Sequence, residues 1–206
     1  SVNSIIVKQD KIIYALDKKS LTADVIGSDL AYGDIFIPRS ITHENREFII
    51  TSINECSFKF QKQIKSISFP TDSETRSFEN ESFAFSDIES ITIPSRVCRL
   101  EGEWCNRTIF FRRVKIMPNN PIFMCLNNQM ILGKTCEKRE NYDNLIFVCR
   151  SIEKVIIPSF ITQIASCAFS SSIVSQIVTT SSITRICKSA FSYCGNLKEI
   201  EFPSDS

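Results

Sequence analysis

Glycine and histidine are scarce in this chain of 206 residues, which has five glycines and one histidine. So little glycine excludes most phosphate-binding loops, and any His-based triad or dyad would have to use His43. Lys and Arg total 24 against 23 Asp and Glu, so the chain has no basic excess for general nucleic-acid binding. No apolar run reaches the ~18 residues of a membrane-spanning helix, and no leader is visible before the first strand pattern.

The apolar residues that are present favour strands. They make up 43% of the chain, with 31 Ile, 16 Phe and 9 Val against 8 Leu. β-Branched and aromatic side chains pack well on pleated surfaces, whereas leucine is the commoner choice in helices. A chain of this length buries roughly 70% of its unfolded surface, so it needs neither a metal nor disulfides for stability.

Nine cysteines are spread along the chain without any C-x-x-C pair, so the usual zinc and redox spacings do not occur. Because the number is odd, at least one thiol is unpaired within the chain. A free cysteine behaves as a small hydrophobic residue, and large domains rarely depend on disulfides. We therefore predict mostly reduced thiols, with Cys105 and Cys194 buried in the core.

A proline-ended phrase reveals an internal repeat. Five of the seven prolines close an apolar-x-apolar-Pro sequence: IFIP at 35–38, ISFP at 67–70, ITIP at 91–94, VIIP at 155–158 and IEFP at 200–203. Two variants, ending at Met117 and Thr180, complete a basic spacing of 22 to 24 residues with two longer intervals. This spacing is in the range of leucine-rich repeats.

A second phrase, apolar-x-x-apolar followed by small-Phe, recurs after the proline slot, as in ITQIASCAF at 161–169. Together the phrases predict an α/β solenoid dominated by strands, with about 23 residues per turn, a parallel main sheet and short helical turns. Phe58, Phe83, Phe169 and Phe191 should form a buried ladder away from that sheet. The seven expected strand rows are 34–37, 64–69, 88–93, 111–116, 152–157, 174–179 and 197–202.

The repeat at 183–203, ITRICKSAFSYCGNLKEIEFP, resembles the BspA-like leucine-rich repeat of bacterial and protist surface antigens. Departures are local: Cys187 stands where glycine is usual, Trp104 replaces alanine and Cys105 replaces phenylalanine. The resemblance implies a binding protein at the cell surface or secreted, which contacts host cells, extracellular matrix or other microbes. Its ligand would be a protein or a glycan.

The resemblance and the strand patterns also divide the chain. Residues 1–32 are predicted to form an N-terminal β-hairpin cap, and residues 33–206 the solenoid. A β insertion at about 119–151 interrupts the repeats, with Asn127-Asn128 as a hairpin turn because Asn tolerates positive φ. We expect the insertion to loop out as a flap. Since no cap follows the last strand, we expect truncation of a longer array at the C-terminus.

The outward-facing strand positions predict a binding face. In each row the two residues that flank the central apolar residue point away from the core. If the insertion loops out, the rows at 111–116 and 152–157 meet and form a basic band beside two apolar residues. The predicted binding residues are Arg112, Arg113, Lys115, Lys154, Ile156 and Val178. Arg112 is the weakest member because it lies at the strand's edge.

The sequence contains no recognisable catalytic or cofactor motif, since no metal-ligand spacing or phosphate loop occurs. We therefore predict a noncatalytic repeat protein without cofactor or metal, whose main function is binding. Two alternatives stay open. One is an intracellular scaffold of the same fold, in which the cysteines are ordinary reduced thiols. The other is a thiol-dependent hydrolase that uses His43.

Overall fold

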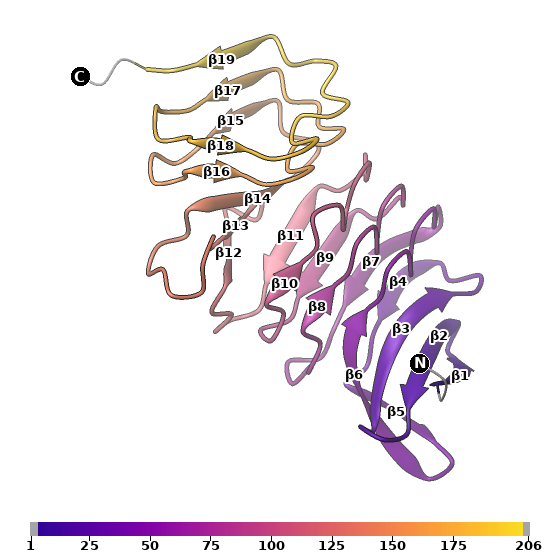
Figure 1. Ribbon diagram of the computed structural model, residues 1–206. Coiled ribbons are helices and arrows are strands. Elements are labelled where there is room, and N and C mark those ends of the chain that lie inside the picture. The colour runs from indigo at the N-terminus through magenta and orange to yellow at the C-terminus, as the bar shows by residue number, and fades with distance from the viewer. Residues whose placement is uncertain (1–3, 204–206) are drawn as a thin grey trace.

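The chain is a β-solenoid with repeats of about 23 residues. The structure, a computed structural model, describes residues 4–203. Across that range the chain consists of strands and turns without a helix. Figure 1 shows two stacked halves, with the strands of the C-terminal half at a steep angle to those of the N-terminal half. The predicted strand-dominated solenoid is confirmed, and the predicted helical turns are wrong.

Seven short strands form the main face of the solenoid, and six of them lie inside their predicted rows, while the first begins one residue before its row. In the N-terminal half the order is β11-β9-β7-β4, with parallel pairing throughout: β4 (Gly33–Phe36), β7 (Ile64–Ser68), β9 (Ser90–Ile93) and β11 (Arg113–Ile116). In the C-terminal half the parallel order is β15-β17-β19: β15 (Lys154–Ile156), β17 (Gln176–Val178) and β19 (Glu199–Glu201). The main face is therefore two sheets, not the single sheet that the repeat predicted.

The second extended run of each repeat forms the opposite face. In the N-terminal half these parallel strands are β6 (Arg46–Ile53), β8 (Ser77–Phe78) and β10 (Arg99–Leu100), with β5 (Ser40–His43) antiparallel to β6. In the C-terminal half they are β16 (Gln163–Ile164) and β18 (Arg185–Ile186). A proline slot precedes each run because proline cannot donate to the ladder of the strand before it.

An antiparallel meander precedes the first repeat. It consists of β1 (Ser4–Gln9), β2 (Ile12–Asp17) and β3 (Thr22–Ser28), and β3 then pairs in parallel with β6. The meander buries Tyr14 and Leu16 against the first repeat. It thereby covers apolar residues that have no preceding repeat to pack against.

The insertion contains three strands and joins the solenoid. They are β12 (Phe123–Leu126), β13 (Met130–Gly133) and β14 (Asn144–Val148). The first two form a hairpin through Asn127 and Asn128, both at positive φ, as the sequence predicted. β14 pairs in parallel with β16 and begins the second-face sheet of the C-terminal half. The expectation that the insertion loops out is therefore wrong, because its last strand is a rung of the solenoid.

Left-handed residues replace the predicted helical turns. In the turn after β6, Cys56 and Phe60 have φ of 58° and 62°, values that an α-helix does not accommodate. Three consecutive turns close there: Ser57 N donates to Asn54 O, Lys59 N to Cys56 O, and Gln61 N to Phe58 O. Each repeat therefore uses tight β-turns between its two faces.

The hydrophobic core consists of two clusters, one in each half of the solenoid, and the insertion contributes buried residues to both. Phe58 stacks on Phe83 at 5.4 Å between ring centroids, and Phe169 stacks on Phe191 at 4.9 Å. Between these pairs lie Trp104, Phe111 and Phe147. The predicted phenylalanine ladder thus exists as two pairs, and Phe191 is half-buried because fewer neighbours cover it near the last repeat.

A fully buried arginine joins the two clusters. Nη1 of Arg150 donates to the carbonyls of Val148 (3.1 Å) and Ala168 (2.7 Å). Nη2 donates to the carbonyls of Cys167 (3.3 Å) and Cys105 (3.5 Å), which lie on two different repeats. The guanidinium also lies 4.6 Å from the centroid of Phe147. It bridges the turns of both halves where the insertion interrupts direct backbone pairing.

Candidate binding face

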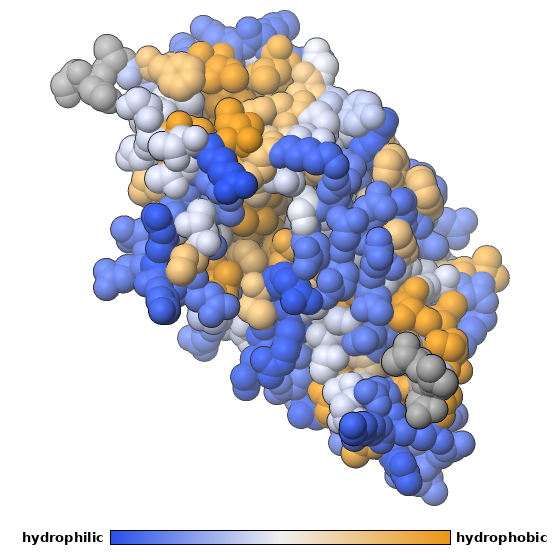
Figure 2. All heavy atoms as spheres, in the orientation of Figure 1, coloured by the Kyte–Doolittle hydropathy of each residue, from blue (hydrophilic) through white to orange (hydrophobic). Residues whose placement is uncertain are grey.

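The rows of outward residues on the main face follow the strand registers. In the N-terminal half, Arg113 pairs with Ser90 and Lys115 with Thr92. In the C-terminal half, Lys154 pairs with Gln176, which pairs with Glu199. A second C-terminal row holds Ile156, Val178 and Glu201. Figure 2 shows apolar side chains gathered over β15, β17 and β19.

The structure does not join these rows into one basic band. β11 ends one sheet and β15 begins another, so Arg113 and Lys115 are not in a row adjacent to Lys154. The correction has a physical cause: the hairpin β12–β13 lies between the two sheets. Its tip contacts β11, since Val114 N donates to Asn128 O at 3.4 Å. On the other side, Cys149 N donates to Gln129 O at 2.7 Å.

The charged residues of the predicted face differ in their pairing. Arg112 forms a hydrogen-bonded ion pair with Glu89, which also pairs with Lys65 at 3.3 Å. These two cations hold the pKa of Glu89 below its usual range, against the opposing effect of desolvation. Arg113, Lys115 and Lys154 are exposed, and no carboxylate of the described residues pairs with them. Three of the four predicted cations therefore remain available to a ligand.

Two hollows flank the hairpin tip on this face. The first, of about 460 Å³, lies between β11 and the hairpin and is lined by Lys115, Met117 and Tyr142 among others. The second, of about 380 Å³, lies between the hairpin and β15 and is lined by Leu126, Ile152, Lys154, Ile156 and Pro158 among others. Each hollow thus combines a free lysine with apolar side chains.

Hairpin residues at the tip were absent from the predicted site. Asn127 and Gln129 line the second hollow, and Asn128 lines the first. The Asn-Asn pair predicts the turn itself. Where the hairpin lies in the molecule depends on the pairing of β14 with β16, and β16 begins more than thirty residues after the start of the hairpin. A parallel pairing of that kind leaves no local signal in the chain.

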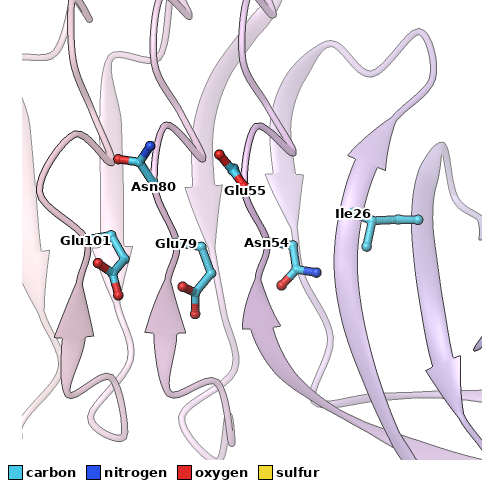
Figure 3. Close-up of a pocket in the computed structure, with 6 residues that line it drawn as sticks. All are labelled: Ile26, Asn54, Glu55, Glu79, Asn80 and Glu101. Atoms are coloured by element: carbon cyan, nitrogen blue, oxygen red, sulfur yellow. The ribbon is translucent and has the colours of Figure 1, made fainter. Parts of the chain in front are cut away.

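An acidic row lies on the second face. Asn54, Glu79 and Glu101 follow β6, β8 and β10 and lie side by side on successive rungs, as Figure 3 shows. Arg99 pairs with both carboxylates, at 2.6 Å from Glu79 and 2.9 Å from Glu101. Within residues 4–203, no three His, Cys, Asp or Glu side chains are grouped to hold a metal ion.

The thiol-dependent hydrolase alternative would need His43 beside a cysteine thiol that ionises readily. His43 ends β5 and lies beside Glu44, with Nε2 of His43 and Oε1 of Glu44 3.8 Å apart. All nine cysteines are free thiols. Burial raises the pKa of Cys105 and of Cys149 to about 12, and that of Cys167 to about 11, which disfavours the nucleophilic thiolate. Cys105 is buried as predicted, whereas Cys194 is only half-buried.

Parallel strands at a spacing of about 23 residues, joined by tight turns around phenylalanine stacks, define a leucine-rich repeat solenoid. The family described as BspA type leucine rich repeat region matches residues 34–120 and 128–206 in six copies. The chain belongs to this family, as its repeat phrases indicated.

Solved structures agree on the fold. A leucine rich cell surface protein from Faecalibacterium prausnitzii is similar with a TM-score of 0.54 and 15% identity, over 97% of this chain and 77% of that one. A leucine-rich repeat protein from Eubacterium ventriosum has a TM-score of 0.52 and 13% identity, over 97% and 72%. At these identities the likeness shows the fold alone. No curated protein matches the chain in sequence. The described residues also contain no helix long and apolar enough to cross a membrane.

Proposed function

We propose that the chain is a noncatalytic binding protein of the cell surface, and that its main face binds an acidic protein or a sulfated glycan of host cells or matrix. One observation carries this proposal: two hollows, each with an unpaired lysine among apolar and polar side chains, flank the hairpin tip on an otherwise regular face. A similar fold occurs in a protein described as a cell surface protein, which supports the location.

The two halves of the face would contribute differently. Arg113 and Lys115 attract an acidic partner over a distance of about 8–10 Å at physiological salt. Ile156 is 63% exposed and lies beside Lys154 in the second hollow, where it offers an apolar anchor. Because long-range attraction changes association rate more than fold stability, the cations can be reversed without unfolding the protein.

The test reverses two charges and keeps a matched control. The variant Arg113→Glu/Lys115→Glu should bind epithelial cells, deposited matrix and immobilised heparin at least tenfold more weakly than the parent in low salt. The control Lys19→Glu/Lys138→Glu has the same net charge, changes two exposed residues that line neither hollow, and should bind like the parent. Binding by the first variant that equals the parent's in low salt would contradict the proposal.

The two alternatives have separate tests. In hydrolase assays, a His43→Ala variant should behave like the parent. Loss of a measurable thiol-dependent activity in this variant would favour the enzyme. Counting free thiols in protein taken from its native source addresses the scaffold, since full reduction is typical of an intracellular compartment.

A further inference from the structure

One left-handed position recurs along an edge of the solenoid. It is the last positive-φ residue of the turn that leads into the main face, and φ there lies between 55° and 62° on five rungs. Glycine and asparagine fit this backbone best, and bulky side chains fit it poorly. The residues found are Phe60, Phe85, Arg107, Ser171 and Tyr193. Four of the five positions thus hold a large side chain where the backbone disfavours one.

These side chains form a continuous row of contacts. The rings of Phe60 and Phe85 lie 4.9 Å apart between centroids. The guanidinium of Arg107 lies 5.6 Å from the ring centroid of Phe85 and 3.8 Å from that of Tyr193. Backbone bonds align the rungs, since Phe60 N donates to Ala84 O and Phe85 N to Asn106 O. Ser171, whose N donates to Ser192 O, is small enough for the arginine to pass over it.

This row, which we call the aromatic edge, is exposed at its two ends and half-buried at Phe85 and Arg107 in its middle. Phe60 is 60% exposed and Tyr193 is 64% exposed. Ile109 and Phe110, which follow Arg107 on the same turn, are 52% and 50% exposed. The turns that join β8 to β9 and β10 to β11 lie side by side along one edge of the molecule (Figure 1). A contiguous apolar surface of this kind marks an interaction site more often than scattered single residues do.

The unpaired positive charge of Arg107 on the aromatic edge favours an acidic partner. Lys59 is neutralised by Glu81 at 2.5 Å. Arg107 has no carboxylate partner among residues 4–203, and its guanidinium lies over the ring of Tyr193 and near that of Phe85. A guanidinium held in this way keeps its edge N–H groups free for a carboxylate, which it can bind through two hydrogen bonds.

We propose that the aromatic edge is a second interaction surface, which binds an extended segment of a protein partner through an acidic side chain flanked by apolar ones. Tyrosine, arginine and phenylalanine are enriched at the buried centres of protein interfaces, which favours a protein over other ligands. Five rungs span about 19 Å, the length of about six residues of extended chain. The surface is separate from the main face, so it does not depend on the function proposed above.

The test uses a phage-displayed library of random 12-residue peptides, panned against the parent protein. Enriched peptides should carry Asp or Glu between aromatic or aliphatic residues. Arg107→Glu should weaken their binding at least tenfold, and Arg107→Lys should weaken it less, because lysine keeps the charge but not the flat fork. Arg185→Glu, at an exposed arginine on β18 that forms no ion pair with the described residues, is the charge-matched control and should bind like the parent.

Two aromatic variants separate binding from folding. Phe60→Asn and Tyr193→Asn place a residue that tolerates the left-handed backbone, so their melting temperatures should equal or exceed the parent's while peptide binding falls. The variant Arg113→Glu/Lys115→Glu should keep full peptide binding. The proposal is overturned if no acidic-apolar peptide is enriched, or if enriched peptides bind Arg107→Glu as well as the parent. Binding of heparin or hyaluronan that Arg107→Glu abolishes, without peptide binding, would assign the surface to a glycan instead.

Discussion

Replacing Arg150 is the sharpest perturbation of how the two halves are held together. Its side chain is buried, and Nε finds no partner among the described residues, while Nη1 and Nη2 reach four carbonyls. Burial lowers the pKa of the guanidinium, an unfavourable effect of desolvation without a compensating carboxylate. The sign of the Arg150→Met effect therefore depends on which of two opposed contributions is larger.

We expect the contribution of the Arg150 hydrogen bonds to exceed the cost of desolvating its guanidinium. A bond from a charged donor contributes about 1.5–3 kcal/mol net, so the two shorter bonds, to Val148 O and Ala168 O, contribute roughly 3–6 kcal/mol. Removing a charged group from water costs several kcal/mol, which offsets much of this gain. The carbonyls would not be left bare, because Ala168 O also accepts from Val148 N at 3.0 Å and Cys105 O from Thr108 Oγ1 at 2.8 Å. We therefore expect Arg150→Met to lower the free energy of unfolding by about 2–3 kcal/mol.

Urea denaturation followed by tryptophan fluorescence and by circular dichroism measures this change. Trp104 lies in the N-terminal cluster, so the two signals should coincide in the parent and separate in Arg150→Met as the halves uncouple. Arg150→Ala should cost about 2 kcal/mol more than Met because it also leaves a cavity. Arg185→Met, which removes an exposed arginine on β18, is the matched control and should change little. An Arg150→Met midpoint at or above the parent's would refute the reasoning.

Three further predictions follow from buried groups. Phe169→Ala should cost about 3–5 kcal/mol in urea denaturation and half-buried Phe191→Ala clearly less; equal losses, or a loss below about 1 kcal/mol at Phe169, would show that the turns are wrongly placed. Folded pKa values near 12 for Cys105, Cys149 and Tyr14 lie above the ordinary values of 9.0, 9.0 and 10.0. The unfolded chain therefore binds fewer protons between about pH 9 and 12, and stability should fall across that window, more gently in Cys149→Ala than in the parent. In native protein, Ellman's reagent should react with exposed Cys56, Cys98 and Cys136 well before Cys105 and Cys149; equal rates would contradict the burial.

Much of the fold could be predicted because proline and phenylalanine mark the same points of most repeats. Proline follows five of the seven main-face strands, so the positions of β7, β9 and β15 follow from the spacing of the repeat phrase. The turn conformation could not be predicted in the same way. Positions such as Phe60 and Tyr193 are left-handed without glycine, so the usual sequence signal for positive φ is missing.

The boundary between the two halves of the solenoid is less predictable from sequence than the repeats are. The basic residues on β11 and β15 are exposed, but their separation depends on the parallel pairing of β14 with β16, far along the chain. Arg150 likewise follows an ordinary strand, and arginine is rarely buried, so its role in the core carries no sequence signal. Both features arise from long-range pairing, which the local repeat phrases do not encode.

Site-specific photo-crosslinking tests the main-face binding proposal most directly. A benzoylphenylalanine residue placed at Ile156, which is 63% exposed in the second hollow, should crosslink to cell-surface or matrix components. The same residue placed at exposed Arg185 on the second face should not. Crosslinks from position 156 that disappear in the Arg113→Glu/Lys115→Glu background are the predicted result. Crosslinks from position 185 alone would contradict the account.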